Sequence, residues 1–334
     1  MRYGALLLVA ACYSAPALKT GSPCDQGPCP AGLVCSPKTL TCELSAEEAN
    51  PVEDAAEMVY LDAPPDAPEF PANDLPQNPL DVTAGGTFVA NLNNAHDDAP
   101  QNSCGGDGGA DVFYTVNLPG AEVLYFDTFG SNFATTIRVF PGKQCTDVAQ
   151  AMMPCSHTAC GGAQSQLALQ LPSGVSCIVV DQTAGEMNGA LTLTVKRGGR
   201  VGAHLNAGMQ TLTGNTCDGS DTSSAPDDCD ASVGAKDLSY YFTTCPGQTL
   251  KLDASTCADP TMVNFDTVVY LKPLGKPHLA CNDDGDGCVA RPDRPDHPDG
   301  SIISASTNGT NLYWLTVDGY GAACGNYQIV TNLR

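Results

Sequence analysis

Two stretches decide the fold: Asp111-Val112-Phe113-Tyr114 and, further along the chain, Asp237-Leu238-Ser239-Tyr240-Tyr241-Phe242. Each joins an aspartate to a run of aromatic and aliphatic residues, a composition typical of β-strands. Each is followed by a second matching segment, Asn132-Phe133-Ala134-Thr135 in the first case and Asn264-Phe265-Asp266-Thr267 in the other. Because these landmarks recur in the same order, we interpret roughly the last 230 residues as one pattern present twice.

A further landmark completes each copy. Cys177-Ile178-Val179-Val180-Asp181 in the first copy corresponds to Trp314-Leu315-Thr316-Val317-Asp318 in the second. Between the landmarks lie short apolar runs, several with period-two alternation, separated by Gly, Pro and Asn turns. The sequence therefore predicts an all-β chain with two tandem β-sandwich or jelly-roll domains, at residues 82–197 and 201–334.

The order of these landmarks resembles that of the bacterial pre-peptidase C-terminal (PPC) family, β-sandwich modules found beside secreted proteases and in surface proteins. That family has an aspartate before an aromatic strand, a Gly-led strand, an Asp before an aliphatic strand, and a late aromatic strand. The second copy matches at Asp237, Tyr240, Phe242, Gly247, Leu250, Asp266, Val269, Leu271, Tyr313 and Val317. The first copy matches at Asp111, Phe113, Gly120 and Ile178, but Ala134 stands where the second copy has Asp266.

The N-terminus is typical of an export signal. Arg2 precedes the apolar run Ala5-Leu6-Leu7-Leu8-Val9-Ala10-Ala11, which is too short to span a bilayer. Val9-Ala10-Ala11-Cys12 resembles the lipobox of bacterial lipoproteins, whose signal is cut before an acylated cysteine. We expect residues 1–11 to be a lipoprotein signal and Cys12 to carry lipid that holds the chain at the outer membrane or cell surface. The alternatives are an ordinary signal with a coincidental cysteine, or a mis-assigned start codon.

Seventeen cysteines indicate an oxidising compartment, because thiols in such number are rare where the cell keeps them reduced. Without Cys12 their number is even, which fits complete pairing. We expect disulfides to take up Cys24, Cys29, Cys35, Cys42, Cys104, Cys145, Cys155, Cys160, Cys177, Cys217, Cys229, Cys245, Cys257, Cys281, Cys288 and Cys324.

The distribution of these cysteines adds two expectations. Four of them define a small disulfide-rich knot at residues 23–42, which follows a tether at residues 12–22. Each β-repeat then holds an odd number, so complete oxidation requires a bridge between the repeats, or else leaves free thiols. Sequence proximity suggests pairing Cys145 with Cys155, and Cys281 with Cys288, without settling either.

Residues 43–81 form an acidic, proline-rich segment without Lys or Arg. Charge repulsion and polyproline geometry extend such chains, and too few apolar residues are present to drive folding. We expect a disordered acidic linker. The net charge of the whole chain, -22, also argues against nucleic acid as a partner, because binding phosphates requires Lys and Arg.

One loop has the spacing of a calcium site. Asn282, Asp284 and Asp286 occupy positions one, three and five, Gly287 takes position six, and Asp293 takes position twelve, as in the opening of an EF-hand loop. Hard oxygen ligands at these positions suit calcium. The alternative is a solvated acidic turn. The first copy has no such ligands at the corresponding point.

The sequence contains no catalytic motif. GxSxG and HExxH are missing, and cysteines in disulfides are not nucleophiles, so we expect no enzymatic activity. Asp181 and Asp318 match between the copies, and we interpret them as turn caps rather than paired acids. Candidate ligand contacts, if they are not core residues, are the aromatic side chains Tyr240, Tyr313, Tyr320 and Trp314.

Together these features predict a surface lipoprotein whose β-sandwiches bind a surface or extracellular protein or a polysaccharide, with calcium as a stabilising ion. An alternative is an accessory subunit, or a remnant, of a secreted hydrolase or protease. The two would be separated by whether binding to a glycan or matrix array is affected by hydrolase inhibitors.

Overall fold

The computed structural model describes residues 24, 29, 33–44, 70–100, 104, 108–148, 153–183, 189–226, 229, 234–259, 261–290 and 299–334. The chain divides into two compact units, Met1–Ala67 and Pro68–Arg334. The first unit contains a hairpin of β1 (Leu33–Cys35) and β2 (Cys42–Leu44), which pair antiparallel. Two disulfides, Cys24–Cys35 and Cys29–Cys42, cross-link this knot.

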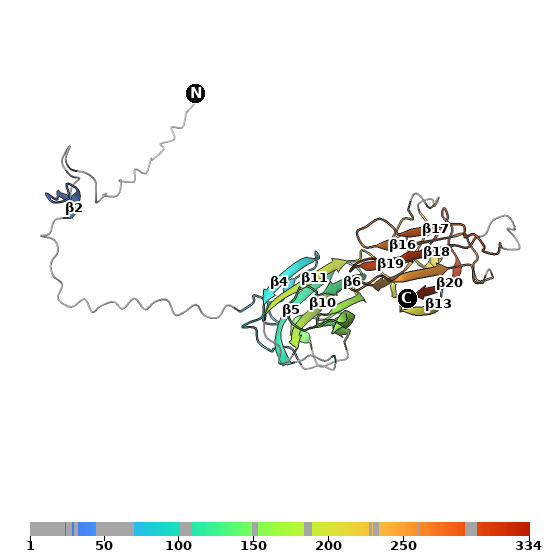
Figure 1. Cartoon of the computed structure of the whole chain (residues 1–334), viewed down its shortest axis with the longest axis horizontal. Coiled ribbons are helices and arrows are strands. Elements are labelled where there is room, and N and C mark those ends of the chain that lie inside the picture. The colour runs from blue at the N-terminus through green and yellow to red at the C-terminus, as the bar shows by residue number, and fades with distance from the viewer. Residues whose placement is uncertain are drawn as a thin grey trace, which may run out of the picture. The chain divides into compact units, whose positions relative to one another are not determined.

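The first half of the second unit is a sandwich of two sheets (Figure 1). One sheet has the order β3 (Leu80–Asp81), β5 (Gly108–Leu118), β10 (Gly174–Thr183), β7 (Thr135–Phe140) and β8 (Cys155–His157). The other has the order β4 (Gly86–Asn91), β11 (Ala190–Arg197), β6 (Glu122–Asp127) and β9 (Gln166–Leu171). Its 3-10 turns are η1 (Cys145–Asp147) and η2 (Ala159–Gly161).

The second half repeats this topology strand for strand. Its first sheet has the order β12 (Ala203–His204), β14 (Leu238–Thr243), β19 (Leu312–Gly319), β16 (Thr267–Pro273) and β17 (Ala280–Asn282). Its second sheet has the order β13 (Gly208–Asn215), β20 (Asn326–Leu333), β15 (Lys251–Ser255) and β18 (Ile302–Ser306), and η3 (Thr216–Asp218) follows β13. The prediction of an all-β chain with two tandem sandwiches is confirmed.

Alternation along the strands builds each core. In β5 the side chains of Val112, Tyr114, Val116 and Leu118 enter the space between the two sheets. Phe113, between them, faces the opposite side, where it packs under the loop that contains Ala99. A strand that is buried on both faces has a nearly continuous apolar sequence, which is why this segment is so easy to recognise.

A buried hydroxyl network confirms that the two halves are copies. In the first sandwich the Ser165 Oγ lies 2.5 Å from the Thr135 carbonyl oxygen, and the Ser165 amide donates to Thr128 Oγ1. In the second, Ser301 Oγ lies 2.5 Å from the Thr267 carbonyl oxygen, and the Ser301 amide donates to Thr256 Oγ1. Because all these hydroxyls are buried, each needs such a partner.

The aspartates that open the two aromatic strands hold the preceding loop. Asp111 Oδ2 accepts the backbone amides of Asp98 and Ala99. Asp237 Oδ2 accepts those of Thr222 and Ser223 in the same way. A carboxylate that accepts two backbone amides fixes the loop that precedes its strand. We call this loop, which contains residues 98–100 in the first copy and 222–223 in the second, the crossing loop. This contact explains why an aspartate recurs just ahead of the aromatic residues in both copies.

The acidic linker is shorter than predicted. Residues 70–81 belong to the first sandwich: Asn73 and Asp74 are buried, and Asn73 Nδ2 donates to the carbonyl oxygen of Phe113 at 3.0 Å. Leu80 and Asp81 form β3, which pairs parallel with β5. The proline-rich sequence indicated a linker rather than a strand. Proline is nevertheless compatible with β3, because an edge strand needs few backbone amides for pairing.

All sixteen cysteines from Cys24 onwards lie in disulfides. In the sandwiches the pairs are Cys104–Cys155, Cys145–Cys177, Cys160–Cys245, Cys217–Cys324, Cys229–Cys281 and Cys257–Cys288. The suggested pairs Cys145–Cys155 and Cys281–Cys288 are wrong, because strand pairing brings cysteines of distant sequence closer than neighbours. Cys160–Cys245 is the bridge between the repeats that the odd cysteine numbers require. Cys12 lies outside the described residues.

Candidate functional site

Trp314, the only tryptophan of the chain, lies where the two sandwiches meet. Its side chain is 1% exposed and packs in a cluster with Val123 and Tyr125 of the first sandwich and Tyr241 and Leu312 of the second. A buried apolar cluster of this kind favours a fixed contact between the two halves. The cross-linking disulfide and a hydrogen bond from Gln166 Nε2 to the Thr244 carbonyl oxygen, 2.9 Å, reinforce it.

The segment that joins the sandwiches is shaped around this indole. A Cβ atom on Gly198 would lie 2.8 Å from Trp314 Cζ2, and a Cβ on Gly202 would lie 2.7 Å from Trp314 Cζ3. Only glycine permits such a close approach of backbone and ring. Between them, Arg200 places its guanidinium carbon 4.6 Å from the indole centroid, a cation–π distance. The joining segment and the Trp314 side chain therefore pack tightly against each other.

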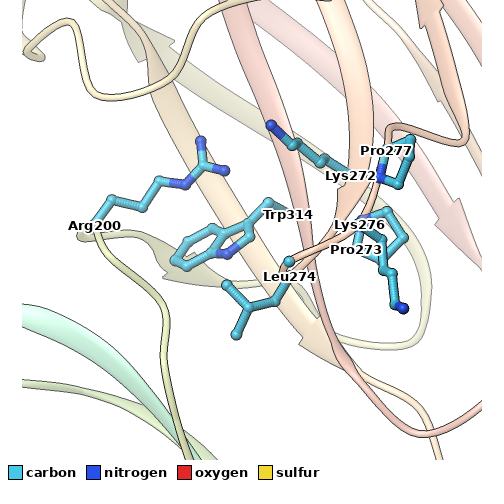
Figure 2. A pocket seen from close by; sticks show the side chains of 8 residues that line it. Arg200, Lys272, Pro273, Leu274, Lys276, Pro277 and Trp314 are labelled. Atoms are coloured by element: carbon cyan, nitrogen blue, oxygen red, sulfur yellow. The ribbon is translucent and has the colours of Figure 1, made fainter. Parts of the chain in front are cut away.

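A pocket opens beside Trp314 and the joining segment (Figure 2). Its volume is about 530 Å³, within the range of small-molecule sites. The lining comes from the joining segment, β19, the end of β16 and the turn that follows it: Arg200, Lys272, Pro273, Leu274, Gly275, Lys276, Pro277 and Trp314. Arg200 Nη1 also donates to Ser239 Oγ at 3.3 Å and to Thr316 Oγ1 at 3.4 Å, so its guanidinium is held in place.

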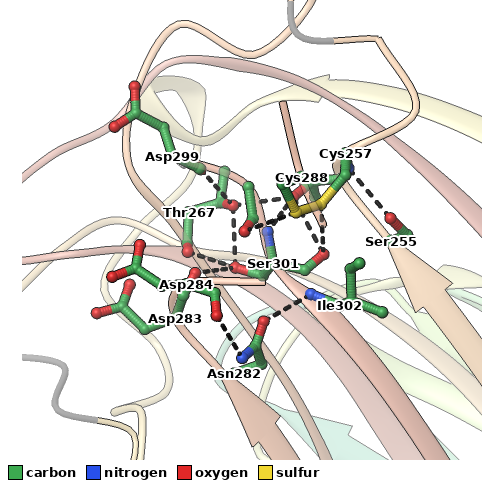
Figure 3. The surroundings of a disulfide bond; sticks show 12 residues. Ser255, Cys257, Thr267, Asn282, Asp283, Asp284, Cys288, Asp299, Ser301 and Ile302 are labelled. Carbon is green, nitrogen blue, oxygen red and sulfur yellow. Dashed lines mark hydrogen bonds between the residues drawn. A yellow bond between two sulfur atoms is a disulfide. The ribbon is translucent and has the colours of Figure 1, made fainter. Parts of the chain in front are cut away.

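The predicted calcium loop is arranged differently from an EF-hand opening. Asn282 Nδ2 donates to the Asp284 carbonyl oxygen at 3.0 Å, and Asn282 Oδ1 accepts the Ile302 amide at 2.7 Å (Figure 3). The asparagine oxygen therefore already serves the backbone of β18. Asp286 is exposed, and Asp293 lies outside the described residues.

The structure instead brings Asp266, Asp283 and Asp284 together. One carboxylate oxygen of each lies within 4.8 Å of the other two. Asp266 stands just before β16 and the other two follow β17, so strand pairing creates the group. The loop is held by Ser301 Oγ, 2.8 Å from the Asp283 carbonyl oxygen, and by the nearby Cys257–Cys288 disulfide (Figure 3). Three hard oxygen donors suit calcium.

At the matching positions that the structure describes, the first sandwich lacks this acidic group. Ala134 precedes Thr135 as Asp266 precedes Thr267. Ser165 Oγ contacts the carbonyl oxygen of Ser156, 2.9 Å away, as its counterpart contacts that of Asp283. Two of the three acidic positions are thus alanine and serine in the first copy. The sequence indicated that the two repeats differ at Asp266 and Ala134. In the structure this difference extends to the whole group of three carboxylates, which the second copy alone assembles at these positions.

Asp181 and Asp318 are not turn caps at the surface. Both are buried within their strands, at 1% and 4% exposure. Asp181 forms an ion pair with Arg138, whose Nη2 lies 2.5 Å from Asp181 Oδ2. Asp318 instead lies 3.4 Å from the Tyr270 hydroxyl. Burial, reinforced by the charges of Asp237 and Asp221, raises the pKa of Asp318 to about 7.

The candidate aromatic contacts are mostly core residues. Tyr240, Tyr313 and Trp314 are buried, and only Tyr320, at 45% exposure, is open to solvent. Sequence reasoning missed the basic side chains of the pocket, Arg200 and Lys272. Their signal was weak but present: the chain has only 15 Lys and Arg, so any clustering of them is informative.

No protein-family model matches this sequence, and no curated protein matches it. Among solved structures, it is similar to the pre-peptidase C-terminal domain of a collagenase from Bacillus anthracis, with 10% identity, 40% of this chain and 96% of that chain covered, and a TM-score of 0.25. It is also similar to the CUB1-EGF-CUB2 domains of rat MASP-1, with 10% identity, 76% and 98% coverage, and a TM-score of 0.19. A third is BuGH86wt in complex with neoagarooctaose, with 10% identity, 74% and 32% coverage, and a TM-score of 0.17.

Among the residues that the structure describes, no helix combines the length and apolar composition needed to cross a bilayer.

Proposed function

We propose that this chain is an exported binding module, held at the cell surface through lipid on Cys12, that takes up a protein or polysaccharide ligand without catalysis. The observation that carries the proposal is the pocket beside Trp314, which is built on a rigid, cross-linked scaffold. Rigid walls reduce the entropy cost of binding. The eight disulfides support an oxidising, extracytoplasmic location.

A direct test uses the full-length native chain on an array of glycans and extracellular matrix proteins. We expect saturable binding to one class of ligand, unchanged by hydrolase inhibitors, with no fragments released from the array. Release of fragments would contradict a purely binding role and would favour the hydrolase-linked alternative. Mass spectrometry of the same preparation checks the anchor: an unmodified N-terminus upstream of Cys12 would exclude acylation there.

We also propose that calcium stabilises the second sandwich at Asp266, Asp283 and Asp284. Their carboxylates would supply three of the six to eight oxygens that calcium takes. The role is structural: the ion would tie the residue before β16 to the loop after β17.

Isothermal titration with calcium separates this group from the sequence-predicted loop. We expect Asp266→Asn and Asp284→Asn to remove the heat of binding, whereas Asp286→Asn should retain it because its carboxylate is not part of the group. Loss of heat in Asp286→Asn with retention in Asp266→Asn would instead favour the EF-hand-like set. Absence of heat with the native chain would exclude both.

A further inference from the structure

The pocket beside Trp314 concentrates positive charge in a strongly acidic chain. Three of the 15 Lys and Arg residues line it, Arg200, Lys272 and Lys276, and no Asp or Glu does, although the chain has 37 acidic residues. In Figure 2 the Lys272 ammonium points towards the side on which the Arg200 guanidinium lies, while Lys276 extends from the turn to another side. Arg200 and Lys272 therefore direct two positive charges towards the same side of the pocket.

Within the described part of the chain, the two lysines of this pocket are not neutralised by a carboxylate. Neither lysine ammonium has an ion-pair or hydrogen-bond partner among the described residues. Arg200 donates to the hydroxyls of Ser239 and Thr316, and it also interacts with the Tyr270 hydroxyl and the Asp237 carboxylate. Elsewhere in the sandwiches, arginines pair with carboxylates, as Arg138 does with Asp181. Like charges that share a pocket repel each other, and a bound anion relieves that repulsion.

We propose that this pocket binds the carboxylate-bearing sugars of an acidic polysaccharide, an inference that rests on the proposed binding function and specifies its ligand class. Arg200 offers its remaining guanidinium donors to a sugar carboxylate, a pairing whose geometry suits arginine. Lys272 adds a second positive charge from the opposite wall, and Lys276 reaches the neighbouring unit of the polymer.

Two observations favour a sugar acid over other anions. The walls contributed by Pro273, Leu274 and Pro277 are apolar, and the ring faces of sugars present C–H groups that pack against such surfaces. The net charge of -22 repels a densely charged polymer such as nucleic acid. A polyuronate carries at most one charge per ring, so two or three local cations can outweigh the repulsion.

The test titrates the native, full-length chain with a short oligogalacturonate and with its methyl ester, which has the same rings without the charge. We expect the acid to bind and the ester to bind at least about tenfold more weakly, because a charge-assisted hydrogen bond is lost. Lys272→Ala should weaken binding of the acid about tenfold, and Lys143→Ala, an exposed lysine of the first sandwich, should leave it unchanged. Unchanged thermal unfolding of Lys272→Ala confirms that the variant is folded.

Three outcomes overturn the inference. The first is equal affinity of the native chain and Lys272→Ala for the acid. The second is equal binding of acid and ester. The third is stronger binding of an acidic peptide of matched charge than of the oligosaccharide. If the native chain fails to bind the acid but binds another glycan or a matrix protein on the array, this inference falls while the proposed function stands. If it binds nothing on the array, both fall.

Discussion

Asp181 and Asp318 occupy matching positions in the two copies, but one lies beside a positive charge and the other beside a neutral hydroxyl. Asp181 contacts Arg138 of β7, and Asp318 contacts Tyr270 of β16. Arg138 and Tyr270 also match, because each is the third residue after the threonine that begins its strand. Both of these side chains also bond to the crossing loop: Arg138 to the Pro100 carbonyl oxygen at 2.5 Å, and Tyr270 to that of Ser223 at 3.1 Å. Among the residues that the structure describes, an ion pair with this aspartate forms in the first copy alone.

This difference predicts a pH dependence for Asp318. Burial raises its pKa to about 7, against about 3.9 in an unfolded chain. Between these values the native state keeps a proton that the unfolded state has released, so the free energy of unfolding falls as pH rises from about 4 to 7. We expect Asp318→Asn to remove most of that fall, which about three pKa units place at about 4 kcal/mol, as measured by denaturant unfolding at several pH values. Parallel pH profiles of the native chain and the variant would contradict this.

The equivalent change in the first copy should behave differently. Asp181→Asn leaves the guanidinium of Arg138 buried without its counter-charge. We expect a loss of about 3 kcal/mol in the free energy of unfolding, present throughout the neutral range rather than confined to a pH window. The two variants serve as controls for each other, because they change the same chemical group at matched positions. A loss below about 1 kcal/mol for Asp181→Asn would show that the ion pair contributes little.

The segment that joins the sandwiches can pack closely against Trp314 because it contains glycines at the points of contact. A Cβ on Gly202 would lie 2.7 Å from Trp314 Cζ3 and 2.8 Å from the Ser239 carbonyl oxygen, distances that require the ring or the strand to move. We expect Gly202→Ala to lower stability by about 2 kcal/mol and to shift the fluorescence of the single tryptophan to the red. Gly120→Ala is the matched control, because nothing lies within 4 Å of its new Cβ. Unchanged emission of Gly202→Ala would mean that the segment does not shape the indole site.

Strands were predictable from sequence where burial is two-sided or strictly alternating, as in β5 and β19. The partners of these strands were harder to predict, because pairing joins segments far apart in the chain. For the same reason the cysteine pairs Cys145–Cys177 and Cys229–Cys281 were missed, whereas the need for a bridge between repeats followed from parity alone. The basic pocket combines Arg200 with Lys272, which no local spacing rule connects. Asp266 was recognised as a repeat landmark, but its approach to Asp283 depends on the pairing of β16 and β17.

At the scale of the whole molecule, one disulfide couples the sandwiches covalently. Cys160–Cys245 closes a separation of 85 residues, and within the described residues no other disulfide spans the two halves. We expect the double variant Cys160→Ser/Cys245→Ser to lose about 3 kcal/mol of stability, through greater entropy of the unfolded chain. The midpoint of unfolding, followed by Trp314 emission, should fall accordingly. An unchanged midpoint would show that the apolar contacts alone hold the halves together.

The same bond decides how the molecule carries mechanical load. If the ends of the second unit are pulled apart, tension passes across the two sulfur atoms and bypasses the residues between positions 160 and 245. The joining segment and strands β9 to β14 lie in that bypassed loop, so they cannot be drawn out while the bond is intact. The sandwiches cannot separate by stretching of the segment between them. A molecule of this kind resists extension as a single body.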